Sequence, residues 1–502
     1  MELSSPVRVV VVDDNPTHLV SITNGLAKAG IPCVSHWYDI QNSALVPPAP
    51  AGGYPYLRML FTDLNIREMS GAIADPKSLA GVLISEVLQP VVAPTCGPYS
   101  ICLWTSTGGK ANEVSPLIIE RVNDESMGED RRPAPLLVNI MEKREFVPDK
   151  DEATDQALAS LFRQNNQGPR IEESISRAIL ENPQLRAAFS WESRASHAAA
   201  QTINNVYEVS RFERTTDMNE SRAFQTVLTK IAIEAAGKKS AKQDPPRALD
   251  DGLADLFVDK MHGSAGFPPY REAVNASIGA LLAGSAPTLT TESRTALNTI
   301  LHLEKMNTDG THVERGLVLD INTDAALESL GMGNRKNFIF NELVYNSGLF
   351  ESAVQSATVD AAPDLKTLED GYKFVMAHKD ELLEKTRIVA IEVGADCDHA
   401  QRKERTIRCL LGAEIPSDLA LFIYGPQSKR LRSDSLREFG PWEVETGKKF
   451  HLLFSLSRFA VQQSWLRKKD FSARYRLRKP LVDQILHWYS TYSTRPGIIA
   501  IT

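Results

Sequence analysis

Short apolar runs that end abruptly in polar residues recur through the first 150 residues. The runs are Val9–Asp14, Arg58–Asp63, Ile101–Ser106 and Leu136–Lys143. Apolar runs of this length, separated by helix-like segments, are typical of strands buried on both faces in a parallel sheet. The pattern therefore predicts an α/β domain over residues 1–150, with polar side chains gathered at the carboxyl ends of its strands.

The polar residues at these ends differ from strand to strand. Asp13 and Asp14 follow the first run, and Asp63 closes the second. Neighbouring carboxylates repel each other and favour a bound divalent cation, which prefers oxygen ligands. An acid pair at a strand end is also an ordinary way to begin a turn and cap a helix. The third run ends in hydroxyls at Thr105, and the fourth ends in the cation of Lys143.

This order of acid pair, single acid, hydroxyl and lysine resembles the receiver domain of two-component response regulators. The resemblance implies a flavodoxin-like, doubly wound parallel sheet in which Asp63 accepts a phosphoryl group from a phosphohistidine. It also implies a Mg²⁺ site formed by Asp13, Asp14, Asp63 and Asn65. Thr105 is then the switch residue that moves to the acyl phosphate, and Lys143 is the contact to a phosphoryl oxygen.

The chain departs from a minimal receiver in three places. A Pro/Gly-rich insertion occupies residues 41–56, the interval from Thr105 to Lys143 is long, and Arg144 stands where the family usually has proline. The alternative interpretation is a degenerate receiver that keeps the sheet and serves only as a docking module.

The pattern changes to helical periodicity over residues 151–385. Apolar side chains recur at helical spacing at Ile171, Ile175 and Ile179, and further stretches rich in helix formers follow. The polar run 237–246, which ends in two prolines, is the best candidate for a linker. We therefore expect a mainly helical middle region.

Residues 386–502 favour strands. Short β-rich runs at close spacing suggest a small barrel, completed by an amphipathic helix over Pro480–Tyr489. The runs are Arg387–Val393, Thr406–Leu411, Leu419–Tyr424, Trp442–Glu445 and Phe450–Phe454. The chain is thus expected to hold three domains, at 1–150, 151–385 and 386–502.

A speculative output site lies after the first of these C-terminal runs. Cys397 and Asp398 loosely resemble a Cys-Asp feature of small SH3-like barrels in bacterial conflict proteins. Basic neighbours such as Lys403 would lower the pKa of the thiol and make it a nucleophile. The flanking carboxylates Asp396 and Asp398 oppose thiolate formation, and cysteine is often a small buried apolar residue.

Composition narrows the class of protein. Hydrophobic residues make up 42% and charged residues 24% of the 502 positions, as in soluble globular proteins. No apolar run approaches the ~20 residues of a membrane helix, and the five cysteines are scattered, which favours a reducing cytoplasm. The net charge of −7 argues against bulk attraction to nucleic acid. Residues 451–502 are locally basic and aromatic, which indicates either a phosphate-rich partner or a solvated face that contacts the acidic remainder.

The three-part order resembles receiver-domain proteins that are paired with histidine-kinase-like ATPases in predicted bacterial anti-phage systems. Three functions remain open. The first is a response-regulator-like switch phosphorylated on Asp63 by such a kinase-like partner with Mg²⁺. The second is a nucleic-acid-directed effector, such as a nuclease, gated by the receiver. The third is a non-catalytic scaffold, and no membrane partner is expected for any of them.

Overall fold

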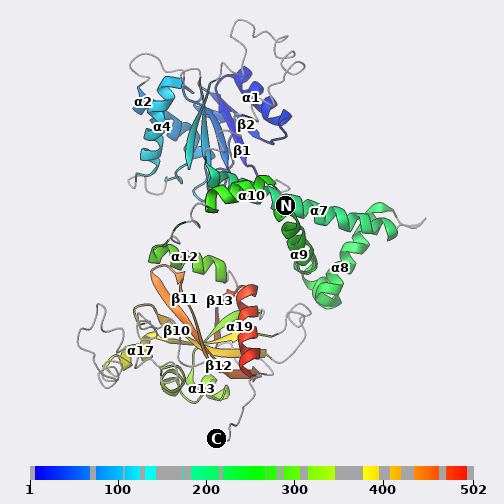
Figure 1. The fold of residues 1–502 in the computed structure, drawn as a ribbon, viewed down its shortest axis with the longest axis vertical. Coiled ribbons are helices and arrows are strands. Elements are labelled where there is room, and N and C mark those ends of the chain that lie inside the picture. The colour runs from blue at the N-terminus through cyan, green and yellow to red at the C-terminus, as the bar shows by residue number, and fades with distance from the viewer. Residues whose placement is uncertain are drawn as a thin grey trace. The chain divides into compact units, whose positions relative to one another are not determined.

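The computed structural model of the chain describes residues 6–67, 75–105, 108–124, 131–142, 173, 182–213, 219–266, 268–279, 284, 288–305, 315–344, 377–394, 407–419, 435–462 and 471–493. These residues form two compact units (Figure 1). Unit 1 comprises Met1–Gln201 and Asp259–Ala286, and unit 2 comprises Thr202–Val258 and Pro287–Thr502. The predicted helical stretch around Ile171, Ile175 and Ile179 lies outside the described residues apart from Glu173, and so does the predicted strand Leu419–Tyr424 apart from Leu419.

Unit 1 is built on a six-stranded sheet with the order β3-β2-β1-β4-β5-β6. Its strands are β1 (Val9–Asp13), β2 (Val34–Asp39), β3 (Ala44–Val46), β4 (Met59–Asp63), β5 (Ser100–Thr105) and β6 (Leu137–Glu142). All neighbouring pairs are parallel except β2 and β3. The predicted parallel sheet is confirmed except at the antiparallel β2–β3 pair, and the four apolar runs of the sequence are its strands β1, β4, β5 and β6.

Helices cover both faces of this sheet, which explains why its central strands are apolar throughout. Helix α1 (Pro16–Lys28) packs on the face that carries Val9 and Val11. Helices α2 (Pro76–Leu83) and α4 (Gly108–Val122), with the π-helical segment η2 (Ile84–Leu88), pack on the face of Val10 and Val12 (Figure 1). Between α2 and β5 the short α3 (Gln89–Val91) follows η2 directly.

The middle of the chain is helical, as predicted. It contains α7 (Pro183–Ser210), α8 (Glu220–Gln243), α9 (Pro245–Gly263) and α10 (Pro268–Val274). The polar run 237–246 is a bend between helices: α8 kinks at Gly237, whose φ is 77°, and α9 begins at Pro245. Two of the three boundaries between the units fall inside α7 and α9, the third falls between Ala286 and Pro287, and none falls at this run. None of the described helices is long and apolar enough to cross a membrane.

Unit 2 contains a seven-stranded antiparallel sheet with the order β11-β12-β10-β9-β8-β13-β7. Its strands are β7 (Leu303–Lys305), β8 (Leu317–Ile321), β9 (Arg387–Glu392), β10 (Ile407–Pro416), β11 (Leu436–Glu445), β12 (Lys448–Gln462) and β13 (Phe471–Leu477). Strands β7 and β8 precede residue 386, so the sheet also includes part of the region predicted as mainly helical. The run Leu317–Ile321 is short and buried at four of its five positions, which periodicity alone does not distinguish from a helical segment.

The sheet curls into a nearly closed, barrel-like form, as predicted for the C-terminal region. Arg474 of β13 contacts Glu414 of β10 and Glu445 of β11, although β8 and β9 separate β13 from β10 in the strand order. Helix α19 (Lys479–Ser493) packs with Leu410 and Phe454 on one side of the sheet.

The other side of the sheet is covered by short helical segments. Leu411 and Leu453 share a core with α13 (Asp324–Ser329), η9 (Phe338–Val344) and α17 (Lys379–Lys385). Two further helices of unit 2 are α12 (Thr291–His302) and α14 (Arg335–Asn337).

Candidate metal centre

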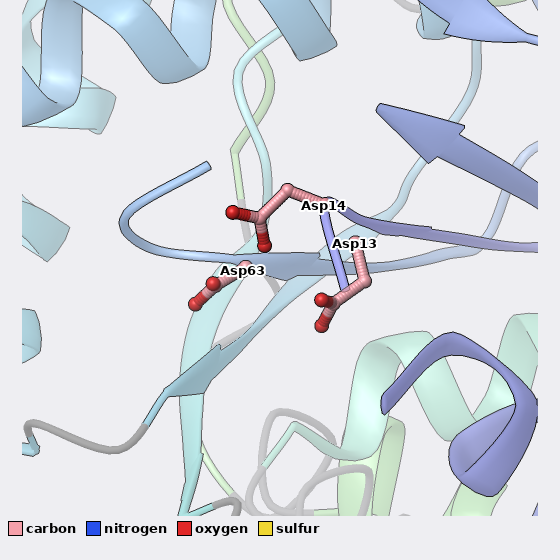
Figure 2. Close-up of side chains that lie close together, drawn as sticks. All are labelled: Asp13, Asp14 and Asp63. Atoms are coloured by element: carbon pink, nitrogen blue, oxygen red, sulfur yellow. The ribbon is translucent and has the colours of Figure 1, made fainter. Parts of the chain in front are cut away.

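Three carboxylates meet at the carboxyl edge of the unit 1 sheet. Asp13 and Asp14 stand at the end of β1, and Asp63 at the end of the neighbouring strand β4 (Figure 2). One oxygen from each of the three lies within 4.8 Å of the others. The sequence prediction that these acids come together is confirmed.

Local hydrogen bonds fix the start of helix α1 beside the site. Asn15 is the N-cap, and its Oδ1 accepts hydrogen bonds from the backbone N–H groups of Thr17 at 2.9 Å and His18 at 3.4 Å. Asp13 Oδ1 accepts from the backbone N–H of Asn15 at 2.8 Å. Capping of the helix thus falls to Asn15, so the side chain of Asp14 is not needed for it.

A neighbouring strand holds the backbone of the acid pair. Trp37 of β2 donates its indole Nε1–H to the carbonyl oxygen of Asp14 at 2.8 Å, and it is the register partner of Asp13. The strand end therefore has little freedom to splay away from β2. This indole contact was not predicted from the sequence, because nothing in the β2 run points to it.

The donor set suits a hard divalent cation. Carboxylate oxygens are the ligands that Mg²⁺ prefers, and two ligands on opposite sides of the ion lie about 4 Å apart. At most one pair of the three oxygens can lie on opposite sides of one ion, so these oxygens, which stand within 4.8 Å of one another, must move closer together to bind it directly. Asp13 is fully buried, so its charge costs free energy unless a cation or donors compensate for it. Asp13, Asp14 and Asp63 therefore fit a metal ion.

The remaining receiver-like positions divide into two groups. Thr105 is buried and ends β5, which lies directly beside β4, and Asn65 follows Asp63 in the next turn. These residues stand at or next to the acidic edge. Lys143 lies outside the described residues, and so do Cys397, Asp398 and Lys403. The described thiols Cys102 and Cys409 are buried, and burial raises the pKa of each.

A histidine near the site was also not predicted from the sequence. His18, in the first turn of α1, has its Nδ1 at 3.7 Å from Asp13 Oδ1. His18 follows Asp13 by five residues, which places it in the helical turn beside the end of β1. This spacing is the signal in the sequence that could have identified it.

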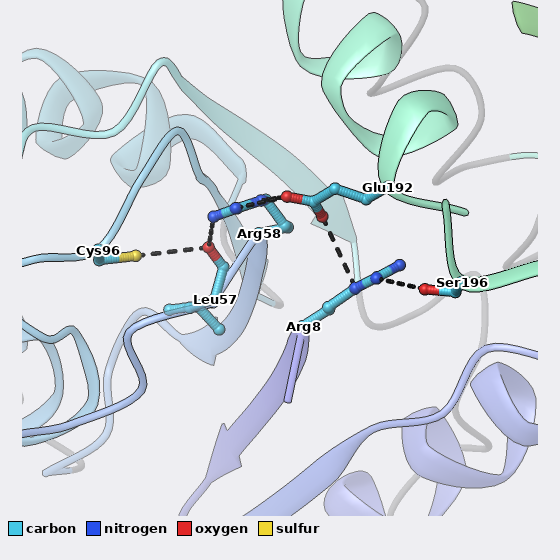
Figure 3. Close-up of polar contacts among 6 residues, drawn as sticks. All are labelled: Arg8, Leu57, Arg58, Cys96, Glu192 and Ser196. Atoms are coloured by element: carbon cyan, nitrogen blue, oxygen red, sulfur yellow. Dashed lines mark hydrogen bonds and ion pairs between the residues drawn. The ribbon is translucent and has the colours of Figure 1, made fainter. Parts of the chain in front are cut away.

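A second polar cluster lies at the opposite ends of the same two strands (Figure 3). Arg8 precedes β1 and Arg58 precedes β4, and both pair with Glu192 of α7, at 3.6 and 2.5 Å. Arg8 also donates to Ser196 Oγ at 3.0 Å. Both arginines lie far from Glu192 along the chain, so the sequence near residue 192 does not indicate this cluster.

Three arginines in the described part of residues 451–502 form ion pairs within unit 2. Arginines of this segment pair with acidic side chains: Arg474 with Glu414 at 3.0 Å, Arg476 with Glu304 at 2.5 Å, and Arg458 with Glu342. Of the two interpretations of this segment, contact with the acidic remainder accounts for these described arginines. They lie on strands β12 and β13 rather than on a helix.

Comparison of the chain with protein-family models, with curated proteins and with solved structures finds no significant match.

Proposed function

We propose that unit 1 is a receiver-like phosphoacceptor domain, in which Asp63 accepts a phosphoryl group in a Mg²⁺-dependent reaction. The observation that carries the proposal is the cluster of Asp13, Asp14 and Asp63, whose oxygens lie within 4.8 Å at the edge where β1 and β4 end.

The strand order supports a flavodoxin-like fold for this unit. When β3 is left aside, the parallel strands follow the order β2-β1-β4-β5-β6, which is 2-1-3-4-5 in chain order. Doubly wound sheets of this order bind ligands where the strand order reverses, between the first and third strands. These two strands are β1 and β4, the strands that carry the acids.

The chemistry divides two roles among the three acids. An oxygen of Asp63 attacks phosphorus and forms a P–O bond, while the leaving group departs with the electron pair of the bond that breaks. The leaving group is acetate from acetyl phosphate, or an imidazole from a phosphohistidine partner. Bound Mg²⁺ offsets the negative charge of the phosphoryl oxygens and carboxylates. Asp13 and Asp14 hold the ion beside Asp63.

The neighbouring strand supplies the residue that responds. Thr105 ends β5 beside β4, and a hydroxyl there donates a hydrogen bond to an acyl phosphate on Asp63. The response then passes to the rest of the chain. In this proposal the phosphodonor in the cell is a histidine-kinase-like partner, and the protein works as a switch rather than as a turnover enzyme.

The test uses the full-length protein with radiolabelled acetyl phosphate, with and without Mg²⁺. We expect Mg²⁺-dependent label that hydroxylamine releases, as it does from an acyl phosphate. The label is lost in Asp63→Asn and retained in Glu113→Gln, a matched change of an exposed carboxylate on α4 in the same unit.

Two outcomes contradict the proposal. If the wild-type protein stays unlabelled with Mg²⁺ and the phosphodonor present, unit 1 is not a phosphoacceptor. The alternative of a degenerate receiver that serves only as a docking module then remains. Label that persists in Asp63→Asn moves the acceptor to another residue.

A further inference from the structure

A pocket of about 800 Å³ opens at one end of the barrel-like sheet of unit 2. It lies where β9 begins, β10 and β11 end, and β12 begins, so strand ends and the β11–β12 turn form its wall. This volume falls within the range of pockets that hold small molecules, and barrel mouths are a common place for them.

The base of the pocket is a buried ion pair. Glu414 of β10 is 3% exposed and accepts a hydrogen bond from Nε of Arg474 at 3.0 Å. Burial raises the pKa of Glu414, and the Arg474 guanidinium opposes that rise. Arg474 is thus held in place by one edge of its guanidinium, through Nε.

The other N–H groups of the Arg474 guanidinium have no hydrogen-bond acceptor among the described residues. Its Nη2 is 3.6 Å from the nearest oxygen of Glu445, which is too far for a hydrogen bond. The guanidinium makes no other hydrogen bond to the residues that the structure describes. The side chain is 15% exposed and lines the pocket, so its remaining donors are open to water or to a ligand there.

Two further groups at the pocket have spare donors. Arg387, at the start of β9, has its Nη1 3.8 Å from Glu445 and makes no guanidinium hydrogen bond within the described part of the chain. The hydroxyl of Ser417 is buried and has no hydrogen-bond partner among those same residues. Both residues line the pocket together with Arg474.

The carboxylate of Glu445 is shared among three cations. Lys448 is hydrogen-bonded to it at 2.7 Å, whereas Arg387 and Arg474 stand 3.8 and 3.6 Å away. One carboxylate has too few oxygens to satisfy two guanidinium forks and an ammonium at once. An oxyanion with more than one negative charge, bound between Arg387 and Arg474, would accept hydrogen bonds from the donors that Glu445 does not engage.

We propose that this pocket binds a small molecule through a phosphate monoester group, held by Arg387, Arg474 and Ser417. Guanidinium forks match phosphate oxygens with paired, charge-assisted hydrogen bonds. The lining carries five basic and four acidic side chains, so the negative charge of the phosphate group offsets an excess positive charge. This site is independent of the acidic edge of unit 1.

The test is isothermal titration calorimetry of the full-length protein with inorganic phosphate as probe, at constant ionic strength and with a chelator present. The chelator removes divalent cations, so that the carboxylate cluster of unit 1 does not contribute. We expect saturable binding of one phosphate per chain, weakened about tenfold or more in Arg387→Gln.

Controls separate this site from general charge effects. Lys230→Gln removes one exposed cation from α8 of the same unit and leaves the affinity unchanged. Ser417→Ala weakens binding without removing any charge, and acetate binds more weakly than phosphate. Absence of saturable binding overturns the proposal, and so does an equal loss in Arg387→Gln and Lys230→Gln.

Discussion

Arg58 donates both its Nε–H and an Nη2–H to one oxygen of Glu192, at 3.0 and 2.5 Å. The two residues are separated by 134 positions, and their side chains are 10% and 21% exposed. Helix α7 is therefore joined to the amino end of β4 by a largely desolvated, charge-assisted contact. Phe189, one turn earlier on α7, packs against the sheet core on the same side as α1.

Removing the carboxylate of this pair is expected to destabilise unit 1. Glu192→Gln leaves the guanidinium of Arg58 largely buried beside a neutral amide, and we expect a loss of about 1–3 kcal/mol in the free energy of unfolding. Urea unfolding checks the value. Glu234→Gln breaks the exposed Lys230–Glu234 pair on α8 and should shift the curve much less. Equal shifts in both variants contradict a structural role for Glu192.

Removing one carboxylate from the cluster of Asp13, Asp14 and Asp63 is expected to stabilise the protein, in contrast to the change at Glu192. Without divalent cations, Asp14→Asn removes one of three charges that repel one another, and we expect it to stabilise the protein by about 1–3 kcal/mol. The same variant should lose most of the stabilisation that Mg²⁺ confers on the wild type. Thermal unfolding with and without Mg²⁺ measures both effects. A destabilised Asp14→Asn that still responds fully to Mg²⁺ would show that Asp14 is not a ligand.

Two adjacent glycines in the insertion 41–56 provide a matched pair. Both have positive φ, 84° at Gly52 and 78° at Gly53, but a Cβ at Gly52 meets nothing within 4 Å. A Cβ at Gly53 would lie 2.8 Å from the backbone oxygen of Val91 and from the backbone nitrogen of Ala93. We expect Gly52→Ala to cost about 1 kcal/mol through its φ alone, and Gly53→Ala about 3 kcal/mol or more. Similar losses in urea unfolding would mean that the insertion does not dock tightly at α3.

A buried histidine gives unit 1 a defined pH dependence. His36 is 1% exposed, with Nδ1 at 2.6 Å from the carbonyl oxygen of Pro47 and Nε2 at 2.9 Å from the hydroxyl of Tyr54. A carbonyl only accepts, so Nδ1 carries the proton and the neutral ring accepts from Tyr54 through Nε2.

Burial lowers the pKa of His36 below the free value of 6.5, so the unfolded chain binds the proton more tightly. The contribution of His36 to stability is complete above this value and is lost as the pH falls below it. The urea midpoint should therefore fall between about pH 7.5 and about pH 5.5 by more in the wild type than in His36→Gln. His262→Gln, which changes an exposed histidine of the same unit, should behave like the wild type. An unchanged pH response in His36→Gln would exclude the buried ring as its source.

Strands could be predicted from the sequence where the burial of a segment matches its pattern of apolar residues. The strands β1, β4, β5 and β6 are apolar because helices cover both faces, so each stands out locally. Strand β13 was not predicted, because its sequence does not show the apolar pattern of a buried strand. Its arginines suggest a solvated surface, and a bulge between Ala473 and Tyr475 interrupts the alternation that marks a strand.

The acidic cluster was predictable because its carboxylates stand at strand ends that parallel pairing brings together. The polar cluster around Glu192 was not, since nothing near residue 192 records that Arg8 and Arg58 will be its neighbours. The same limit applies to the pocket of unit 2. Arg474 meets Glu414 only because the sheet curls, and curvature is a property of the whole sheet rather than of a local run.

The strands β1 and β4 each follow an arginine and end in aspartate. At the amino edge Glu192 compensates part of the positive charge of Arg8 and Arg58, whereas the carboxyl edge gathers three carboxylates. The two edges of the sheet thus differ in what they attract. By its charge, the edge of Asp13, Asp14 and Asp63 would favour small cations and basic surfaces, and a charged partner would be oriented as it approaches unit 1.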